Sequence, residues 1–414
     1  MRSAPPALFR WLAMGLIAGP SGGVAHAETS PYTIGLSQSL VSDSNLLRLD
    51  GGGVAPAGLS KSDLTSITSL FATLDQPFGR QRLLGNVTLR AQRMAQNDIY
   101  DFNGYTVRGG IDWSTIEKLS GTLILASNRS LARLNDTSIS NLPIRNIETT
   151  RQIDATARLG LAGRFGVELG FAGHDVAYSA DEFAAREFSQ QSVSAGLRYR
   201  PSGASSFAAG ARLTRGKYPQ FQTRADGSFE ADRFDRRDLD LTARVEPSGA
   251  SAFDVRLSLS RTDYERAAQR DFSGLTGAAS WSWRPTGKLR FNTALSRDSG
   301  QESSFATPDG LDSGIDFSRL TTALSLRADY ELSAKVGLNS QLAVARRSLA
   351  RTSATAATSD SDTTVTLALG GSWLPTRSIQ LSCDLSSETR RANGVQSSSY
   401  RGSTFGCRGQ ITLQ

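Results

Sequence analysis

Apolar and polar residues alternate one by one along much of this chain. From Val193 to Tyr199 every second residue is apolar, and Ser194, Gly196 and Arg198 lie between them. A period of two residues is typical of β-strands, because successive side chains point to opposite faces. The same alternation recurs through most of the chain, so the pattern predicts an all-β protein of about 18 strands (about 16–18).

Short turns separate these strands in pairs. The octapeptide RPSGASSF (Arg200–Phe207) returns almost unchanged as EPSGASAF (Glu246–Phe253), each time between two alternating segments. We interpret both copies as tight hairpin turns, because Pro, Ser and Gly favour turns. The other short turns are expected at Gln76–Gln81, Ser114–Ser120, Ala162–Arg164, Arg284–Leu289, Glu331–Lys335 and Leu374–Ser378.

The two faces of the strands differ in a way that indicates a membrane barrel. Leu239 and Leu241 share one face, and Asp238, Asp240 and Arg244 share the other. A wall with apolar residues on one side and charges on the other fits a barrel that is apolar outside and polar inside. The pattern predicts a transmembrane antiparallel up-and-down β-barrel in contact with outer-membrane lipid. Short periplasmic turns, long outer loops and both termini on one side complete this prediction.

Aromatic residues gather beside the short turns. Because aromatic girdles mark the membrane interfaces of such barrels, this clustering predicts a girdle at the periplasmic side. Its expected members are Trp113, Phe165, Tyr199, Phe207, Phe253, Trp283, Phe291 and Trp373.

The first residues have the features of a secretory signal. Arg2 and Arg10 precede a short apolar segment (Trp11–Gly19), and the small residues Ala25 and Ala27 form a cleavage pattern. We therefore predict a signal peptide over 1–27, a barrel over 28–414 and a location in the outer membrane of a Gram-negative envelope.

The composition gives little support for an enzyme. Only two histidines occur among the 414 residues, and a hydrolytic triad needs a base within reach of its nucleophile. His174 is the only one after residue 27. DGLDSGID (Asp309–Asp316) lacks the ligand spacing of a calcium loop and is interpreted as a solvated acidic loop. We expect no catalytic activity, no cofactor, no metal and no nucleic-acid partner.

Two cysteines lie near the end of the chain. Cys383 and Cys407 fall opposite each other if the last two strands form a hairpin around Gly394 and Val395. A cross-strand disulfide is then feasible in an exported protein, provided that the sulfur geometry allows it. Two lipid-facing thiols are the alternative, and the disulfide is favoured.

Arginines are expected to line the lumen. Acidic residues share these faces, so ion pairs could hold the wall together, or the arginines could guide an anionic or hydroxyl-rich chain such as a polysaccharide. The outer loops also carry aromatic residues, which suit either sugar binding or packing, and packing is favoured. The expected lumen-lining arginines are Arg198, Arg212, Arg244, Arg256, Arg290 and Arg327.

Three segments resemble one known family. YTIGLSQSLVSDSNLLRL (Tyr32–Leu49), WSWRPTGKLRFNTALSRDSG (Trp281–Gly300) and the cysteine-bearing end resemble the EpsL-type outer-membrane β-barrel proteins of exopolysaccharide biosynthesis, a porin-like family often associated with exosortase systems. The resemblance implies a role in assembling or exporting exopolysaccharide, without assigned catalytic residues. A general diffusion porin for small solutes and a structural or adhesive surface barrel remain the alternatives.

Overall fold

The structure is a computed structural model of the whole chain. It describes most of the chain after the first 29 residues. The described ranges are 30–115, 118–132, 144–160, 163–224, 226–299, 320–353, 356–393 and 397–413. The segment expected as a signal peptide and the acidic loop at 309–316 lie outside these ranges.

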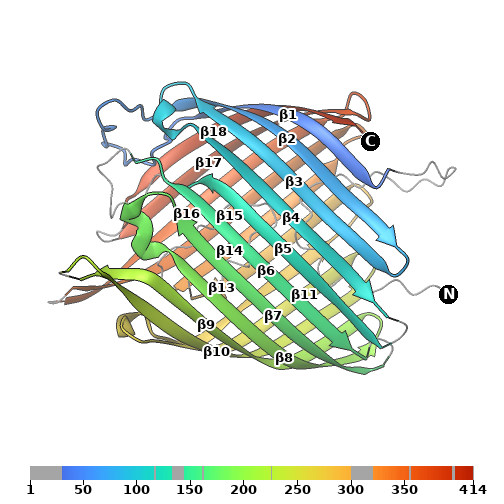
Figure 1. Cartoon of the computed structure of the whole chain (residues 1–414). Coiled ribbons are helices and arrows are strands. Elements are labelled where there is room, and N and C mark those ends of the chain that lie inside the picture. The colour runs from blue at the N-terminus through green and yellow to red at the C-terminus, as the bar shows by residue number, and fades with distance from the viewer. Residues whose placement is uncertain are drawn as a thin grey trace.

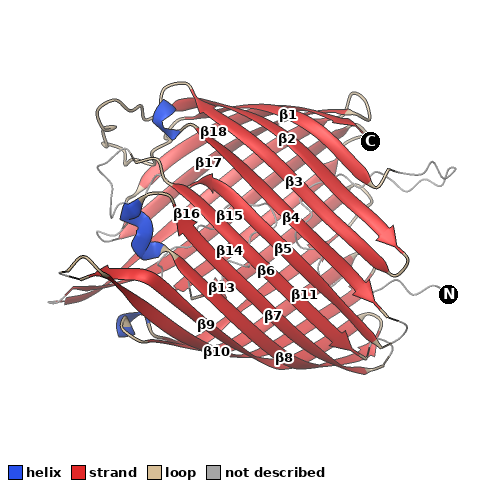
Figure 2. Ribbon diagram, viewed as in Figure 1, coloured by secondary structure: helices blue, strands red, loops and turns tan. Residues whose placement is uncertain are grey.

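Eighteen strands and three short 3₁₀ helices make up the described chain (Figures 1 and 2). The helices are η1 (Asp98–Tyr100), η2 (Asp181–Arg186) and η3 (Ala268–Arg270). The strands are β1 (Tyr32–Asp43), β2 (Asp63–Phe78), β3 (Gln81–Met94), β4 (Phe102–Ser114), β5 (Leu119–Leu131), β6 (Ile147–Leu159), β7 (Phe165–Tyr178), β8 (Phe188–Ser202), β9 (Ser205–Thr223), β10 (Phe229–Ser248), β11 (Ser251–Tyr264), β12 (Phe272–Trp283), β13 (Leu289–Asp298), β14 (Leu320–Glu331), β15 (Val336–Ser353), β16 (Ala356–Trp373), β17 (Ile379–Asn393) and β18 (Tyr400–Leu413).

No helix within the described ranges has the length and apolar character needed to cross a membrane.

The strands form one closed antiparallel barrel. Each strand pairs with its neighbours in sequence, and β1 pairs with both β2 and β18. The β1–β18 ladder runs from Ile34 opposite Leu413 to Asp43 opposite Thr404, which closes the barrel. The predicted up-and-down topology and the count of 18 are therefore confirmed.

The short turns and the longer connections lie at opposite ends of the barrel, as the sequence predicts. The short hairpin turns lie at one end, together with the start of β1 and the end of β18, at the right in Figure 1. The segments that contain η1, η2 and η3 lie at the opposite end. In barrels of this kind the short turns are periplasmic, so the η elements lie on the extracellular side.

The outer connections are not uniformly long. β9 and β10 have 19 and 20 residues, and the connection between Thr223 and Phe229 is short. The prediction of a long polar loop after every second strand is wrong here. Inward aromatic side chains, described below, stabilise this hairpin beyond the membrane, so residues expected in a loop remain in strands.

The outer surface is apolar and the inner wall is polar. On β10, Leu239 and Leu241 are exposed, whereas Arg236 and Asp238 on the opposite face are buried. Exposed leucine, isoleucine, valine and phenylalanine side chains recur on the outward face of nearly every strand. Such a belt is stable only in contact with lipid. The chain is an integral outer-membrane β-barrel.

Stacked aromatic rings mark the periplasmic border of this belt. Phe253, Trp281, Trp283 and Phe291 form a row across β11, β12 and β13, with ring centroids 5.5–5.7 Å apart. The indole nitrogen of Trp281 donates to the Ser251 hydroxyl at 2.9 Å. An apolar ring with a polar contact at its edge suits a membrane interface.

Candidate functional site: the inner wall of the barrel

The six arginines expected in the lumen all occupy inward positions. Each lies between two residues of the same strand whose side chains face outward. Arg198, for example, is buried between the exposed side chains of Leu197 and Tyr199. The positions follow from strand alternation alone, because one face of every strand must meet lipid. The six are Arg198 on β8, Arg212 on β9, Arg244 on β10, Arg256 on β11, Arg290 on β13 and Arg327 on β14.

Carboxylates accompany these arginines on the wall. Arg244 lies between Glu246 on its own strand and Asp254 on β11, at 2.6 and 3.2 Å. Arg327 donates from Nε to Asp329 at 3.0 Å. Strand geometry explains both spacings, because residues two apart share a face and directly opposite residues on neighbouring strands lie close together.

The four arginines on β8 to β11 do not form one patch. Arg198 and Arg256 share a row of the sheet, through Ala208 and Thr242 on the two strands between them. Arg212 instead lies opposite Asp238, which is about 20 Å from Arg244 along β10 at the usual strand rise. The positive groups are therefore distributed along the lumen.

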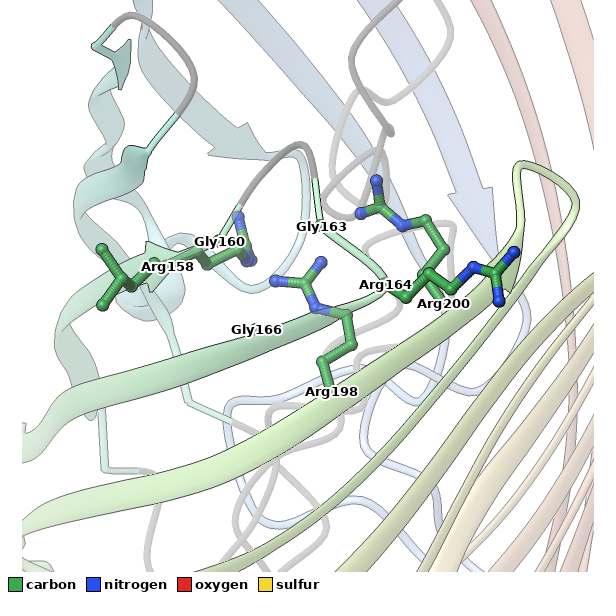
Figure 3. Close-up of a pocket in the computed structure, with 8 residues that line it drawn as sticks. Arg158, Gly160, Gly163, Arg164, Gly166, Arg198 and Arg200 are labelled. Carbon is green, nitrogen blue, oxygen red and sulfur yellow. The ribbon is translucent and has the colours of Figure 1, made fainter.

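Two arginines share one carboxylate near the periplasmic turns. The Glu168 carboxylate accepts from Arg158 Nε at 2.9 Å and from Arg198 Nη2 at 3.2 Å. Figure 3 shows the guanidinium groups of Arg158 and Arg198 turned toward each other, with Arg164 and Arg200 beside them. Because two guanidinium groups share this one carboxylate and two more lie nearby, this part of the wall is locally positive.

The most buried arginine in the described part of the chain is Arg236, which sequence reasoning missed. Its side chain is 1% exposed and lies 3.0 Å from Asp238 and 3.2 Å from Asp298. It also donates to the hydroxyl groups of Ser260 and Ser299. The strand period does place Arg236 inward, but nothing in the period reveals a contact with β13.

Arg212, Asp238, Arg236 and Asp298 form a continuous ion-pair network. Arg212 Nη2 lies 3.3 Å from Asp238, whose side chain is fully buried. The network links β9 and β10 to β13, across β11 and β12. Because a buried charge is costly without a partner, removing one member should destabilise the barrel by leaving the other members unpaired.

Aromatic residues of the outer segments are packed against the inside of the barrel. Val176, Phe188, Tyr218 and Phe234 form a buried cluster, here called the inner aromatic cluster. Its successive rings lie 5.6 and 6.1 Å apart, and Tyr264 adds a further ring at 5.4 Å from Phe234. Buried rings offer no open face to a sugar, so packing explains these aromatics, as expected.

Neighbouring outer segments complete this cluster. Arg270 of η3 places its guanidinium carbon 5.4 Å from the Tyr218 ring and 5.2 Å from the Phe221 ring. His174 lies against Phe188, with ring centroids 5.6 Å apart. His174 is thus part of the packed wall. Within the described ranges, no three His, Cys, Asp or Glu side chains are arranged to hold a metal ion.

The structure joins Cys383 and Cys407 by a disulfide bond. The two residues are directly opposite each other on β17 and β18. They share the outward face with Leu381, Leu385 and Phe405, so the bond lies on the lipid side.

The segment after β1 stabilises the junction between β1 and β18, here called the seam of the barrel. Asp43 accepts two hydrogen bonds from Arg48 Nη1, at 2.9 and 2.8 Å, and Arg48 Nε lies 3.2 Å from Glu388. Buried Asn45 donates to the carbonyl groups of Leu49 and of Arg401 on β18. Burial alone would lower the pKa of Arg48, but the Asp43 and Glu388 carboxylates raise it above its ordinary value.

No family model matches the chain, and no curated protein does. Solved structures with a similar outline come from Pseudomonas aeruginosa. OpdK with vanillate is 12% identical and has a TM-score of 0.49, over 92% of this chain and 99% of that one. OccK2 (OpdF) is 14% identical, with a TM-score of 0.49, over 92% of this chain and 98% of that one.

Proposed function

We propose that this barrel is a channel for the diffusion of small hydrophilic solutes across the outer membrane. The observation that carries the proposal is the closed ring of 18 strands with a polar, charged inner wall. Barrels of about 16–18 strands are wide enough to enclose an aqueous channel. A polar, charged wall is compatible with water and polar solutes inside the barrel.

The pairing of charges indicates which solutes would pass. Arg212, Arg244 and Arg327 each have carboxylates within ion-pair distance. Their fields largely cancel over a few ångströms, so the wall would discriminate weakly between cations and anions. Small neutral and singly charged polar molecules are therefore the proposed substrates.

Conductance across a planar lipid bilayer tests this proposal. The refolded protein should add discrete conductance steps in potassium chloride, with a modest ratio of anion to cation permeability. A barrel that shows heat-modifiable gel mobility, and is thus folded, but gives no conductance would overturn the channel.

Matched substitutions test the role of the wall charges. Arg244→Gln should shift permeability toward cations, because Glu246 and Asp254 lose their partner. Asp254→Asn should shift it toward anions. Arg151→Gln on the outward face should change neither cation nor anion permeability, since Arg151 lies outside the lumen. Unchanged permeability in both lumen variants would contradict a conducting lumen at this height.

The exopolysaccharide role stays a prediction that rests on the motif resemblance alone. Part of the motif at Tyr32–Leu49 stabilises the seam, through hydrogen bonds of Asp43, Asn45 and Arg48. A deletion strain separates the two functions. Slower uptake of a small polar solute with normal surface polymer supports the channel, whereas loss of surface polymer with unchanged uptake supports the exopolysaccharide role.

A further inference from the structure

A group of basic side chains lies on the lipid side of the barrel, just beyond the apolar belt. Arg215 and Lys217 on β9, Arg233 and Arg237 on β10 and Arg261 on β11 are all exposed. We call these five residues the outer basic patch. They continue the outward faces that carry Leu213, Leu239 and Leu259 toward the extracellular end. The patch therefore lies near the height of the headgroups of the outer leaflet.

The register brings like charges together within the patch. Lys217 is directly opposite Arg233, and Arg237 is directly opposite Arg261. Opposite residues on an antiparallel pair have Cβ atoms about 5 Å apart, and like charges at such positions destabilise the sheet. An anion held between them would relieve this repulsion.

Carboxylates of the same surface compensate only part of this charge. Arg215 lies 3.1 Å from Asp235, Arg261 lies 3.0 Å from Asp263, and Arg233 lies 3.9 Å from Glu265. Lys217 and Arg237 form no ion pair with any part of the chain that the structure describes. Five basic groups thus face three acidic ones, and the excess is located in the like-charge pairs.

Strand β6, three strands from β9, shows a different arrangement at the corresponding position. On β6 the first outward residue beyond the apolar run, on its extracellular side, is Arg151. It lies 3.6 Å from Asp175 on β7. This single pair is balanced. Exposed outward arginines also occur on other strands, but Arg129 lies opposite Tyr105 and Arg346 lies opposite Thr322, so no second basic residue faces them. Directly opposed basic residues therefore distinguish β9, β10 and β11 among the described strands.

We propose that the outer basic patch binds the phosphorylated headgroup of an outer-leaflet lipid. The guanidinium groups of Arg237 and Arg261 would hold the phosphate, because arginine binds phosphate oxygens through paired N–H donors. The acyl chains would lie along the exposed leucines directly below, among them Leu239 and Leu259, which are 62% and 63% exposed. A ligand with a phosphate and long acyl chains meets both surfaces at once.

Lipid retention during purification tests the proposal. The wild-type barrel and the double variant Arg237→Gln/Arg261→Gln would be purified in detergent, and titrated with lipid A that carries its phosphates. Binding would be followed by native mass spectrometry. The wild type should bind the lipid at least about 10-fold more tightly than the double variant, corresponding to about 1.4 kcal/mol. Arg151→Gln is the matched control and should bind like the wild type.

Two further arms identify the source of the phosphate. Lipid A stripped of its phosphates should bind the wild type as weakly as phosphorylated lipid A binds the double variant. Inorganic phosphate at millimolar concentration should not displace the lipid. Equal binding of both lipids, displacement by inorganic phosphate, or equal affinity of the double variant would each overturn the proposal. Heat-modifiable mobility verifies that every variant is folded.

Discussion

Arg256 and Leu257 are neighbours in sequence but lie in different surroundings. Arg256 faces the polar inside of the barrel, and Leu257 is exposed on the apolar outside, opposite Leu241. One residue along a strand moves a side chain from water to lipid, because the strand period is two. At the residue scale, the environment follows from the parity of the position.

Leu257→Arg should therefore destabilise the inserted barrel by about 2–4 kcal/mol, since a charge would face the hydrocarbon. Arg256→Gln, one residue away, should cost much less because it keeps a polar group in the lumen. Reversible unfolding from lipid vesicles by denaturant measures both. Equal losses in the two variants would show that the assigned faces are wrong.

At the scale of elements, the same short turn recurs because the same hairpin recurs. The two PSGAS copies join β8 to β9 and β10 to β11, and both show a register shift just before the turn. A second repeat is Pro-Thr, where the Thr286 and Thr376 hydroxyls accept from the backbone N–H groups of Leu289 and Ile379 at 3.1 Å. The EpsL-like segment at Trp281–Gly300 includes such a turn, so part of this resemblance reflects turn chemistry.

The last hairpin offers a test of its own, through the disulfide between β17 and β18. Thiol-reactive label added to denatured, unreduced protein should leave Cys383 and Cys407 unmodified. After reduction both should be labelled. Mass spectrometry of the intact chain counts the labels, and full labelling before reduction would show that the bond is absent.

At the scale of the whole molecule, closure depends on the first and last strands. The β1–β18 ladder is reinforced by Asn45, whose side chain joins the segment after β1 to the Arg401 carbonyl. Without this seam the barrel would expose two edge strands within the membrane, where unsatisfied backbone groups are costly.

Asn45→Ala should lower the thermal stability of the barrel, because the partly buried carbonyl groups of Leu49 and Arg401 lose their donor. The expected loss is about 0.5–1.5 kcal/mol per hydrogen bond removed. The temperature at which heat-modifiable mobility is lost measures it. Asn103→Ala, at an exposed position, is the control, and equal temperatures for the wild type and Asn45→Ala would show that the seam does not depend on Asn45.

The sequence by itself determined the strands, their faces, the short turns and the hairpin that places Cys383 opposite Cys407. These features depend on a period of two and on residues close together along the chain, so the local pattern specifies them. The inward positions of Arg198 and Arg212 follow in the same way. Only the tertiary structure decided which distant residues meet: Arg236 with Asp298, Asn45 with Arg401, and the rings that bury Tyr218. The physical reason is that these contacts depend on the curvature and closure of the barrel and on how the outer segments pack against its wall, and alternation carries no information about either.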